Sequence, residues 1–205
     1  MAPLAATSNT VPTDPSAGLH RRRLPLVALP RKLIRLSLRK YPDPRHWSKL
    51  GIHRFDSPAA TYGVLYTSNS VETAILEEFG DQWRSMRQVR FNDLEQYDVC
   101  ELANTSLSLR VVNATGKHLN RLGTDSNFFA ATDYATTQSW ARSFMTHPQE
   151  PAGIRYNSRK NPRLINYALF GRPEAKAAIE LVRRYRLTQY GPLYPFLLSY
   201  DVAVL

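Results

Sequence analysis

Arginine, tyrosine, serine and one interior glutamate recur in short segments that lie far apart in this sequence. They are Arg35 in LIRLSLRKY, Arg54 in GIHRFDSP, Tyr66 in GVLYTS, Glu77 in ETAILEEF and Ser158 in GIRYNSRKNP. Guanidinium groups form bidentate, charge-assisted hydrogen bonds with phosphates and carboxylates. A compact domain that brings these segments together would therefore suit an anionic ligand.

Each of these residues also has a simpler explanation when it is taken alone. Glu77 falls opposite the apolar face of its helix and would be a solvated glutamate. Tyr66 would be a core tyrosine with its hydroxyl paired, and Ser158 would form a turn before Lys160-Asn161-Pro162. The two arginines would be surface cations. Only the joint appearance of the segments favours a common site.

Short strands and moderate helices alternate along the chain without regular β-α-β units, which favours the α+β class. Branched and aromatic residues predict strands at 63–68, 97–102, 153–157 and 165–170. No internal repeat is present, and one domain is the natural size for 205 residues.

Capping patterns predict three helices. The first is VETAILEEFG, with Asn69-Ser70 before it, a capping box between Asn69 and Glu72, and Gly80 as its stop. The second runs through DYATTQSWARSF and is opened by Thr132 or Asp133. The third is opened by Pro173-Glu174 and continues through AKAAIELVRRYRL.

The formal charge of +10 is concentrated near the N-terminus. Residues 1–40 hold eight Lys/Arg and one Asp, or +7, which leaves +3 for the other 165 residues. Because residues 1–30 are rich in Pro, Ser and Thr, we expect a disordered basic tail there and a folded domain over 31–205. A basic tail on a nearly neutral body makes nucleic acid an unlikely direct partner and leaves simple solvation or electrostatic docking.

Several common kinds of chemistry lack their signatures. The five histidines form no metal-ligand spacing, so we expect no metal, and no dinucleotide-binding, P-loop or hydrolase motif is present. A single cysteine, Cys100, and the lack of a long apolar stretch favour a protein of the cytoplasm without a membrane segment.

Two longer segments resemble the RES-domain family, the toxin halves of RES/Xre toxin–antitoxin pairs. They are GIHRFDSPAATYGVLYTSNSVETAILEEFG and AGIRYNSRKNPRLINYALF, and the resemblance covers about residues 33–171. It implies a single α+β domain similar to the diphtheria-toxin-like ADP-ribosyltransferases. It also implies cleavage of the nicotinamide–ribose bond of NAD, which is then the substrate, with phosphate, water or a protein as acceptor.

The resemblance assigns Glu77, Arg54 and Tyr66 to catalysis, and Arg35, Arg54, Tyr66 and Ser158 to NAD binding. Arg39 also fits the place of Arg35. Many of these toxins carry GGRW where this chain has IHRF, so a degenerate binding module remains an alternative to an NAD-degrading enzyme or a protein ADP-ribosyltransferase. The expected partners are NAD, inorganic phosphate and a helix-turn-helix antitoxin of the Xre type, and a homodimer is a further alternative.

Overall fold

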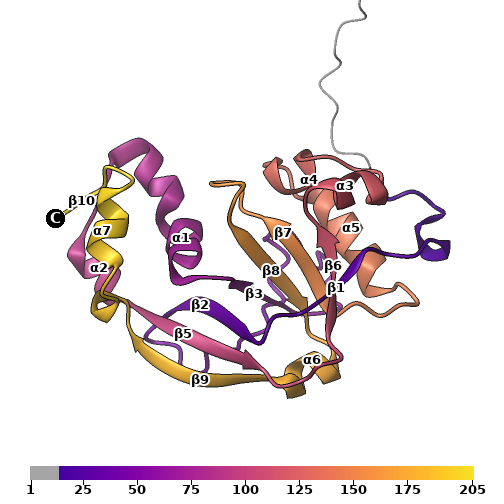
Figure 1. The fold of residues 1–205 in the computed structure, drawn as a ribbon, viewed down its shortest axis with the longest axis horizontal. Coiled ribbons are helices and arrows are strands. Elements are labelled where there is room, and N and C mark those ends of the chain that lie inside the picture. The colour runs from indigo at the N-terminus through magenta and orange to yellow at the C-terminus, as the bar shows by residue number, and fades with distance from the viewer. Residues whose placement is uncertain (1–13) are drawn as a thin grey trace, which may run out of the picture.

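The computed structural model describes residues 14–205, which fold around one eight-stranded sheet (Figure 1). Its strand order is β1-β6-β7-β8-β3-β2-β5-β9, and all neighbours are antiparallel except β6 and β7. A separate parallel pair joins β4 and β10. The strands are β1 (Leu26–Ala28), β2 (Lys32–Leu38), β3 (Val64–Ser68), β4 (Gln88–Val89), β5 (Tyr97–Asn104), β6 (Arg110–Ala114), β7 (Gly153–Asn157), β8 (Ile165–Phe170), β9 (Ile179–Arg186) and β10 (Ala203–Val204).

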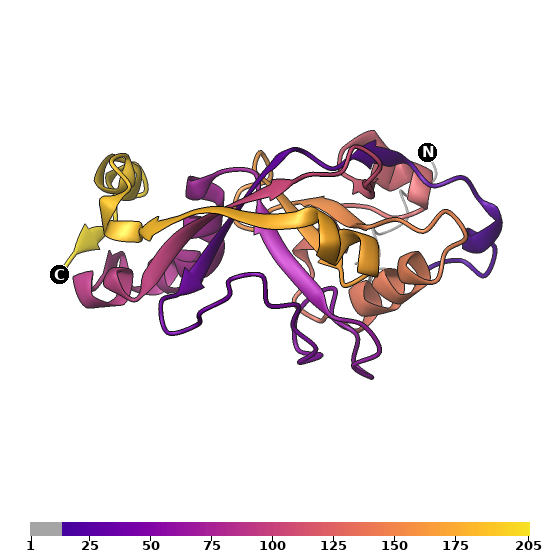
Figure 2. The ribbon, with the colours of Figure 1, turned by 90° about the horizontal axis from the view of Figure 1, so that it is seen from below.

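Helices cover both faces of this sheet and its two ends. They are the short 3-10 helix η1 (Leu19–Arg21), α1 (Val71–Met86), α2 (Phe91–Glu95), α3 (Lys117–Leu122), α4 (Asn127–Ala130), α5 (Ala135–Met145), α6 (Pro173–Ala178), the 3-10 helix η2 (Leu187–Gln189) and α7 (Leu193–Leu198). Both views place η1 and α3 to α5 at one end of the molecule, and α2, α7 and the C-terminus at the other (Figures 1 and 2). The α+β prediction is confirmed, whereas the likeness to diphtheria-type transferases stays a prediction.

The sheet is weakly joined in its middle. Strands β2 and β5 pair through seven residue pairs, whereas β2 and β3 share only one, between Ile34 and Ser68. Beyond that pair the two strands diverge, and their facing backbone groups need other partners. The sheet therefore consists of two halves, β1-β6-β7-β8-β3 and β2-β5-β9, that meet along a short seam.

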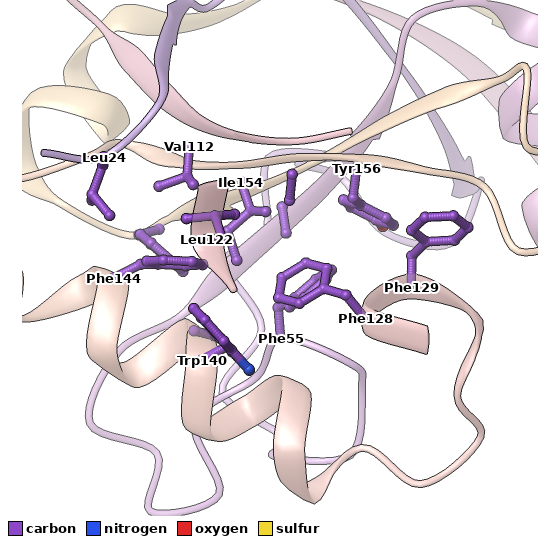
Figure 3. Packing of buried hydrophobic residues seen from close by; sticks show 14 of the residues in the cluster. Leu24, Phe55, Val112, Leu122, Phe128, Phe129, Trp140, Phe144, Ile154 and Tyr156 are labelled. Atoms are coloured by element: carbon purple, nitrogen blue, oxygen red, sulfur yellow. The ribbon is translucent and has the colours of Figure 1, made fainter. Parts of the chain in front are cut away.

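Three apolar clusters hold this arrangement together. The first packs α4 and α5 onto one half of the sheet, where rings such as Phe128, Trp140 and Phe144 meet β7 (Figure 3). The second packs the apolar face of α1 onto the other half of the sheet, together with α7. The third lies on the opposite face of the sheet, under α6. Neighbouring residues of a strand point to opposite faces, so Leu33 belongs to the third cluster and Ile34 to the second. Burial on both faces fixes the registers.

Helix α1 is longer than its sequence signals indicate. Its N-cap is Ser70, whose hydroxyl accepts a hydrogen bond from Thr73 N at 3.1 Å, so the capping box expected between Asn69 and Glu72 is not the one used. Gly80 does not stop the helix, which continues to Met86. A Cβ on residue 80 would come within 2.7 Å of Lys160 Cδ, so this glycine gives room for a lysine stem to cross the helix.

The helix expected after Pro173 is wrong over most of its length. Helix α6 ends at Ala178, and residues 179–186 form the edge strand β9, which pairs with the whole length of β5. The apolar and arginine residues there satisfy a helical wheel, but backbone pairing with a neighbouring strand decides the structure instead. Asp133 does act near the start of α5, where its Oδ1 accepts a hydrogen bond from Ala135 N at 3.0 Å.

The boundary of the expected tail is also wrong. Residues 1–13 lie outside the described chain, but residues 14–30 belong to the fold. Strand β1 pairs with β6, and the side chains of Leu19, Leu24 and Leu29 are buried. The partners of this segment are distant in sequence, so local composition does not reveal that it is ordered.

Candidate active site

A cavity of about 380 Å³ lies along the seam between the two halves of the sheet. Its floor comes from β2 and β3, and one side comes from α1. The other side comes from the loop before β3, the segment that joins α4 to α5, and the turn between β7 and β8. Arg35, Arg54, Tyr66 and Glu77 all line it, so the fold gathers four of the five residues expected at the site.

Glu77 is held in place by a buried amide. Its Oε1 accepts a hydrogen bond from Asn166 Nδ2 at 2.8 Å, and Asn166 Oδ1 accepts one from Ser68 Oγ at 2.7 Å. Asn166 is only 1% exposed, so its amide has little freedom. This chain from β3 through β8 to α1 orients a carboxylate that a helical wheel alone places in solvent.

Tyr66 organises the turn that carries Arg54. Its hydroxyl donates to Asp56 Oδ1 at 3.0 Å and accepts from Phe55 N at 2.9 Å, while Asp56 Oδ2 accepts from His53 N at 3.1 Å. Burial, followed by the charge of Asp56, raises the pKa of Tyr66 well above its usual value, so the phenol stays protonated. Because its single proton is committed to Asp56, this hydroxyl does not donate to a ligand.

Arg35 bridges the seam. Its Nη1 donates to the carbonyl oxygen of Tyr66 at 3.0 Å, which gives this group of β3 a partner where β2 has diverged. Burial lowers the pKa of Arg35, and Cys100 and Glu78 partly offset that effect. Its Nε is buried without a hydrogen-bond partner, while other atoms of the residue line the cavity floor. Arg39, which also fits the place of Arg35 in the family motif, does not line the cavity. Its Nε lies 3.7 Å from Asp98 Oδ1.

Arg54 faces the carboxylate from the loop side. It is only 9% exposed, its Nη1 donates to Ala131 O at 2.8 Å, and its Cζ lies 4.8 Å from the centre of the Tyr134 ring. Burial lowers the pKa of Arg54, whereas Tyr156, Tyr134 and Glu77 raise it. The side chain therefore remains a cation whose charge interacts with Glu77 across the cavity.

Lysine and arginine from the β7–β8 turn close the end of the cavity beside α1. Lys160 Nζ donates to the backbone carbonyl of Glu77 at 2.6 Å and lies 3.4 Å from Asp81 Oδ2. Arg159 Nη2 lies 3.1 Å from Asp81 Oδ1. These contacts fix the turn to the helix and leave cationic groups at the cavity rim.

Ser158 does not line the cavity, and the role in ligand binding that the resemblance assigns to it stays a prediction. Its side chain is fully buried, and its hydroxyl accepts hydrogen bonds from Lys160 N at 3.0 Å and Asn161 N at 3.3 Å. The serine shapes the turn between β7 and β8, as its simpler explanation held. Tyr156, two residues earlier, is the residue of this strand end that lines the cavity.

Tyr134, Tyr156, Asn166 and His53 also line the cavity, and sequence reasoning missed them as site residues. Asn166 carries a recoverable signal, because it is an amide inside the largely apolar strand β8, and Tyr156 lies in the strand end of the RYNS motif. Tyr134 and His53 lie in irregular segments and carry no comparable signal. His53 occupies a place where many toxins of the resembled family have glycine, and its ring meets Tyr66 edge-on at 5.7 Å.

Residues 14–205 contain neither a cluster of metal-ligating side chains nor a helix that could cross a membrane. No three His, Cys, Asp or Glu side chains in that part of the chain gather as metal ligands would. None of the helices between those residues combines the length and the apolar character needed to cross a bilayer.

Comparison with known proteins identifies the family of this chain and a solved structure with a similar fold. The model of the RES domain matches residues 32–190, which is well over half of the chain. The chain belongs to the RES-domain family. The fold of this RES protein is similar to that of a chain in the crystal structure of the M. tuberculosis MbcT-MbcA toxin-antitoxin complex, with a TM-score of 0.62 at 13% identity. The alignment covers 88% of this chain and 98% of that chain. No curated protein matches the sequence.

The match extends beyond the residues expected from the two motifs. The sequence resemblance ends near residue 171, whereas the family model continues to 190 and includes α6 and β9. The edge strand is therefore part of the RES domain and not an appended element. In this RES protein the cavity combines the carboxylate of Glu77, which Asn166 orients, with two desolvated guanidinium groups and an aromatic wall.

Proposed function

We propose that this RES protein binds NAD in the seam cavity and breaks the bond between nicotinamide and ribose. The observation that carries the proposal is the fixed position of Glu77, which Asn166 orients in a cavity that Arg35 and Arg54 also line. A volume of about 380 Å³ lies within the range of ligand pockets, roughly 300–1,000 Å³. The open seam is compatible with an elongated dinucleotide.

The proposed binding follows from charge. The pyrophosphate of NAD is a dianion, and a guanidinium fork matches it with two parallel hydrogen bonds. The desolvated guanidinium groups of Arg35 and Arg54, which both line the cavity, supply the charge and donors for such a contact. The rings of Tyr134 and Tyr156 offer surfaces for the cationic nicotinamide ring.

The proposed chemistry places Glu77 beside the ribose. As the glycosidic bond breaks, nicotinamide leaves with the bonding electron pair and positive charge develops on the ribose carbon. A preorganised carboxylate stabilises that charge more in the transition state than in the ground state. An acceptor oxygen then bonds to the carbon and releases its proton to solvent, giving ADP-ribose from water or its phosphorylated form from inorganic phosphate.

The biological role that we infer is that of a toxin restrained by an antitoxin. Its support is the family together with the fold shared with a chain of a toxin–antitoxin complex. We expect the protein to act in the cytoplasm, where NAD is consumed.

The deciding experiment measures nicotinamide release from NAD by the purified protein, with and without inorganic phosphate. We expect Glu77→Gln to lower the rate by about 100-fold or more, because it removes the charge and keeps the shape. Glu95→Gln, a change on the helix α2 away from the cavity, is the matched control and should leave the rate unchanged.

The other outcomes separate the alternatives. A rate that requires phosphate indicates phosphorolysis, and a rate without phosphate indicates hydrolysis. Labelling of a protein indicates ADP-ribosyl transfer. Binding of NAD without turnover would identify a degenerate module, and neither binding nor turnover would refute the proposal.

A further inference from the structure

Five cations gather at the end of the molecule that carries η1 and α3. Arg21 is the last residue of η1, Arg22 and Arg23 follow it, and Lys117 and Arg121 come from α3. All five side chains belong to exposed residues, and Arg22 Nη2 donates to the carbonyl oxygen of Arg121 at 3.0 Å. We call these five residues the basic end.

The arginine run at the basic end is fixed to the folded body. Leu19 and Leu24, which flank it, are 1% and 3% exposed. Leu24 N donates to Gln149 Oε1 at 2.7 Å, and His147 Nε2 lies 3.2 Å from Leu19 O. The cations therefore hold defined places beside α3, and little conformational entropy is lost when they bind a partner.

The five cations of the basic end form no ion pairs within residues 14–205. The segments 19–29 and 110–123 contain no Asp or Glu. The pKa of His118 is lowered by partial burial and then by Arg121, Lys117 and Arg155. The same surroundings that hold this imidazole neutral would attract an anion.

The chemistry of the basic end distinguishes a polyanion from a protein partner. Protein interfaces have an apolar core rich in large side chains. The large hydrophobic residues that are exposed in the described chain lie elsewhere, at 41–52, in the region from 86 to 107, and from 181 onward. A surface that offers only guanidinium, ammonium and polar groups matches a row of phosphates.

The nearly neutral charge of residues 41–205 argues against a nucleic-acid partner, but the clustering of exposed cations from two segments argues the other way. We propose that the basic end binds the phosphate backbone of double-helical nucleic acid, without reading its sequence. Arg22, Lys117 and Arg121 form the centre of the contact because they come from two segments that lie side by side. None of these residues lines the seam cavity, so this function is independent of NAD chemistry.

The test measures binding of a random-sequence DNA duplex by fluorescence anisotropy over a series of salt concentrations, with the full chain. The triple variant Arg22→Ala, Lys117→Ala, Arg121→Ala removes three contacts. It should reduce the slope of log K against log salt by about 2 to 3, because each phosphate contact contributes roughly 0.9. At ~0.1 M salt that change corresponds to binding that is weaker by about 100- to 1,000-fold.

The matched control is Arg84→Ala, Arg163→Ala, Arg186→Ala, which removes the same charge from exposed positions outside the basic end. Equal loss of binding in both variants would show that net charge alone acts, and would overturn the proposal. So would wild-type binding that is absent or insensitive to salt. Parallel arms with an RNA duplex, anionic vesicles and an acidic peptide identify the ligand class, and a preference for either of the last two refutes nucleic acid. Nicotinamide release, where the protein has it, should be unchanged in the triple variant.

Discussion

The two sides of the seam cavity hold their polar groups by different means. On the frame side, formed by β2, β3, β8 and α1, Glu77 is fixed through Asn166 to Ser68, and all three lie in or beside regular elements. On the loop side, Arg54 lies in a turn whose shape depends on contacts to Tyr66 and on the carbonyl of Ala131. Regular elements hold Glu77 and Arg35, and a loop holds Arg54.

This difference has a physical consequence. Frame-side hydrogen bonds are buried between elements that also form the core, so their loss should reduce both stability and activity. Loop-side groups contribute less to the core and are free to specialise for a ligand. Substitutions on each side test this contrast.

Arg54→Lys should have the largest effect and should separate activity from stability. The substitution keeps the charge but loses the planar fork, and a charge-assisted hydrogen bond is worth about 1.5–3 kcal/mol, or roughly 10- to 100-fold in NAD affinity. The measurement is NAD binding by calorimetry together with the midpoint of urea unfolding. Arg163→Lys, at an exposed position of the β7–β8 turn, is the control. A large fall in the urea midpoint would contradict the contrast.

Asn166→Ala should reduce stability and turnover together. It leaves Ser68 Oγ without its acceptor and releases Glu77, at a cost of about 1–3 kcal/mol for the unsatisfied buried group. Urea unfolding and nicotinamide release measure the two effects on the same sample. The control is Asn157→Ala, which removes an amide whose partner is the exposed carbonyl of Pro162. It should change neither the free energy of unfolding nor the rate of nicotinamide release by much. An unaltered rate for Asn166→Ala would mean that Glu77 does not need this support.

Tyr66→Phe tests the connection between the two sides. It removes the donor to Asp56 and the acceptor for Phe55 N. We therefore expect the free energy of unfolding to fall by about 1–3 kcal/mol and the turn that carries Arg54 to be less well ordered. Because the pKa of this phenol is raised, its ionisation should not appear in the pH dependence of the rate at neutral pH. Tyr194→Phe, on α7, is the control. A rate that drops without any change in stability would instead assign the hydroxyl to the ligand.

Ser158→Ala should have the smallest effect. The hydroxyl accepts two backbone hydrogen bonds in the β7–β8 turn, so we expect about 1 kcal/mol of destabilisation and little change in the rate per folded molecule. Thermal unfolding and nicotinamide release decide the result. A loss of NAD affinity as large as that of Arg54→Lys would restore this serine to the binding site.

Local sequence patterns predicted most of the frame side. Branched and aromatic residues predict strands at 63–68, 97–102, 153–157 and 165–170, close to the observed β3, β5, β7 and β8. The pair Asn69-Ser70 and the apolar stripe predict the start and the buried face of α1. The end of α1 was not predicted, since Gly80 serves the packing of Lys160 and does not end the helix. Among site residues, the two motifs gave Glu77, Tyr66 and Arg54, but not the inward burial of Ser158.

Sequence by itself determined the class of the fold, the helix and strand that carry Glu77 and Tyr66, and the membership that these motifs imply. Tertiary structure alone decided that residues 179–186 form a strand, that residues 14–30 are ordered against β6, and that Asn166 orients Glu77. The reason is the range of the interactions. Periodicity and capping act over a few residues, whereas strand pairing and buried hydrogen bonds join positions separated by about 80 residues or more in these three cases.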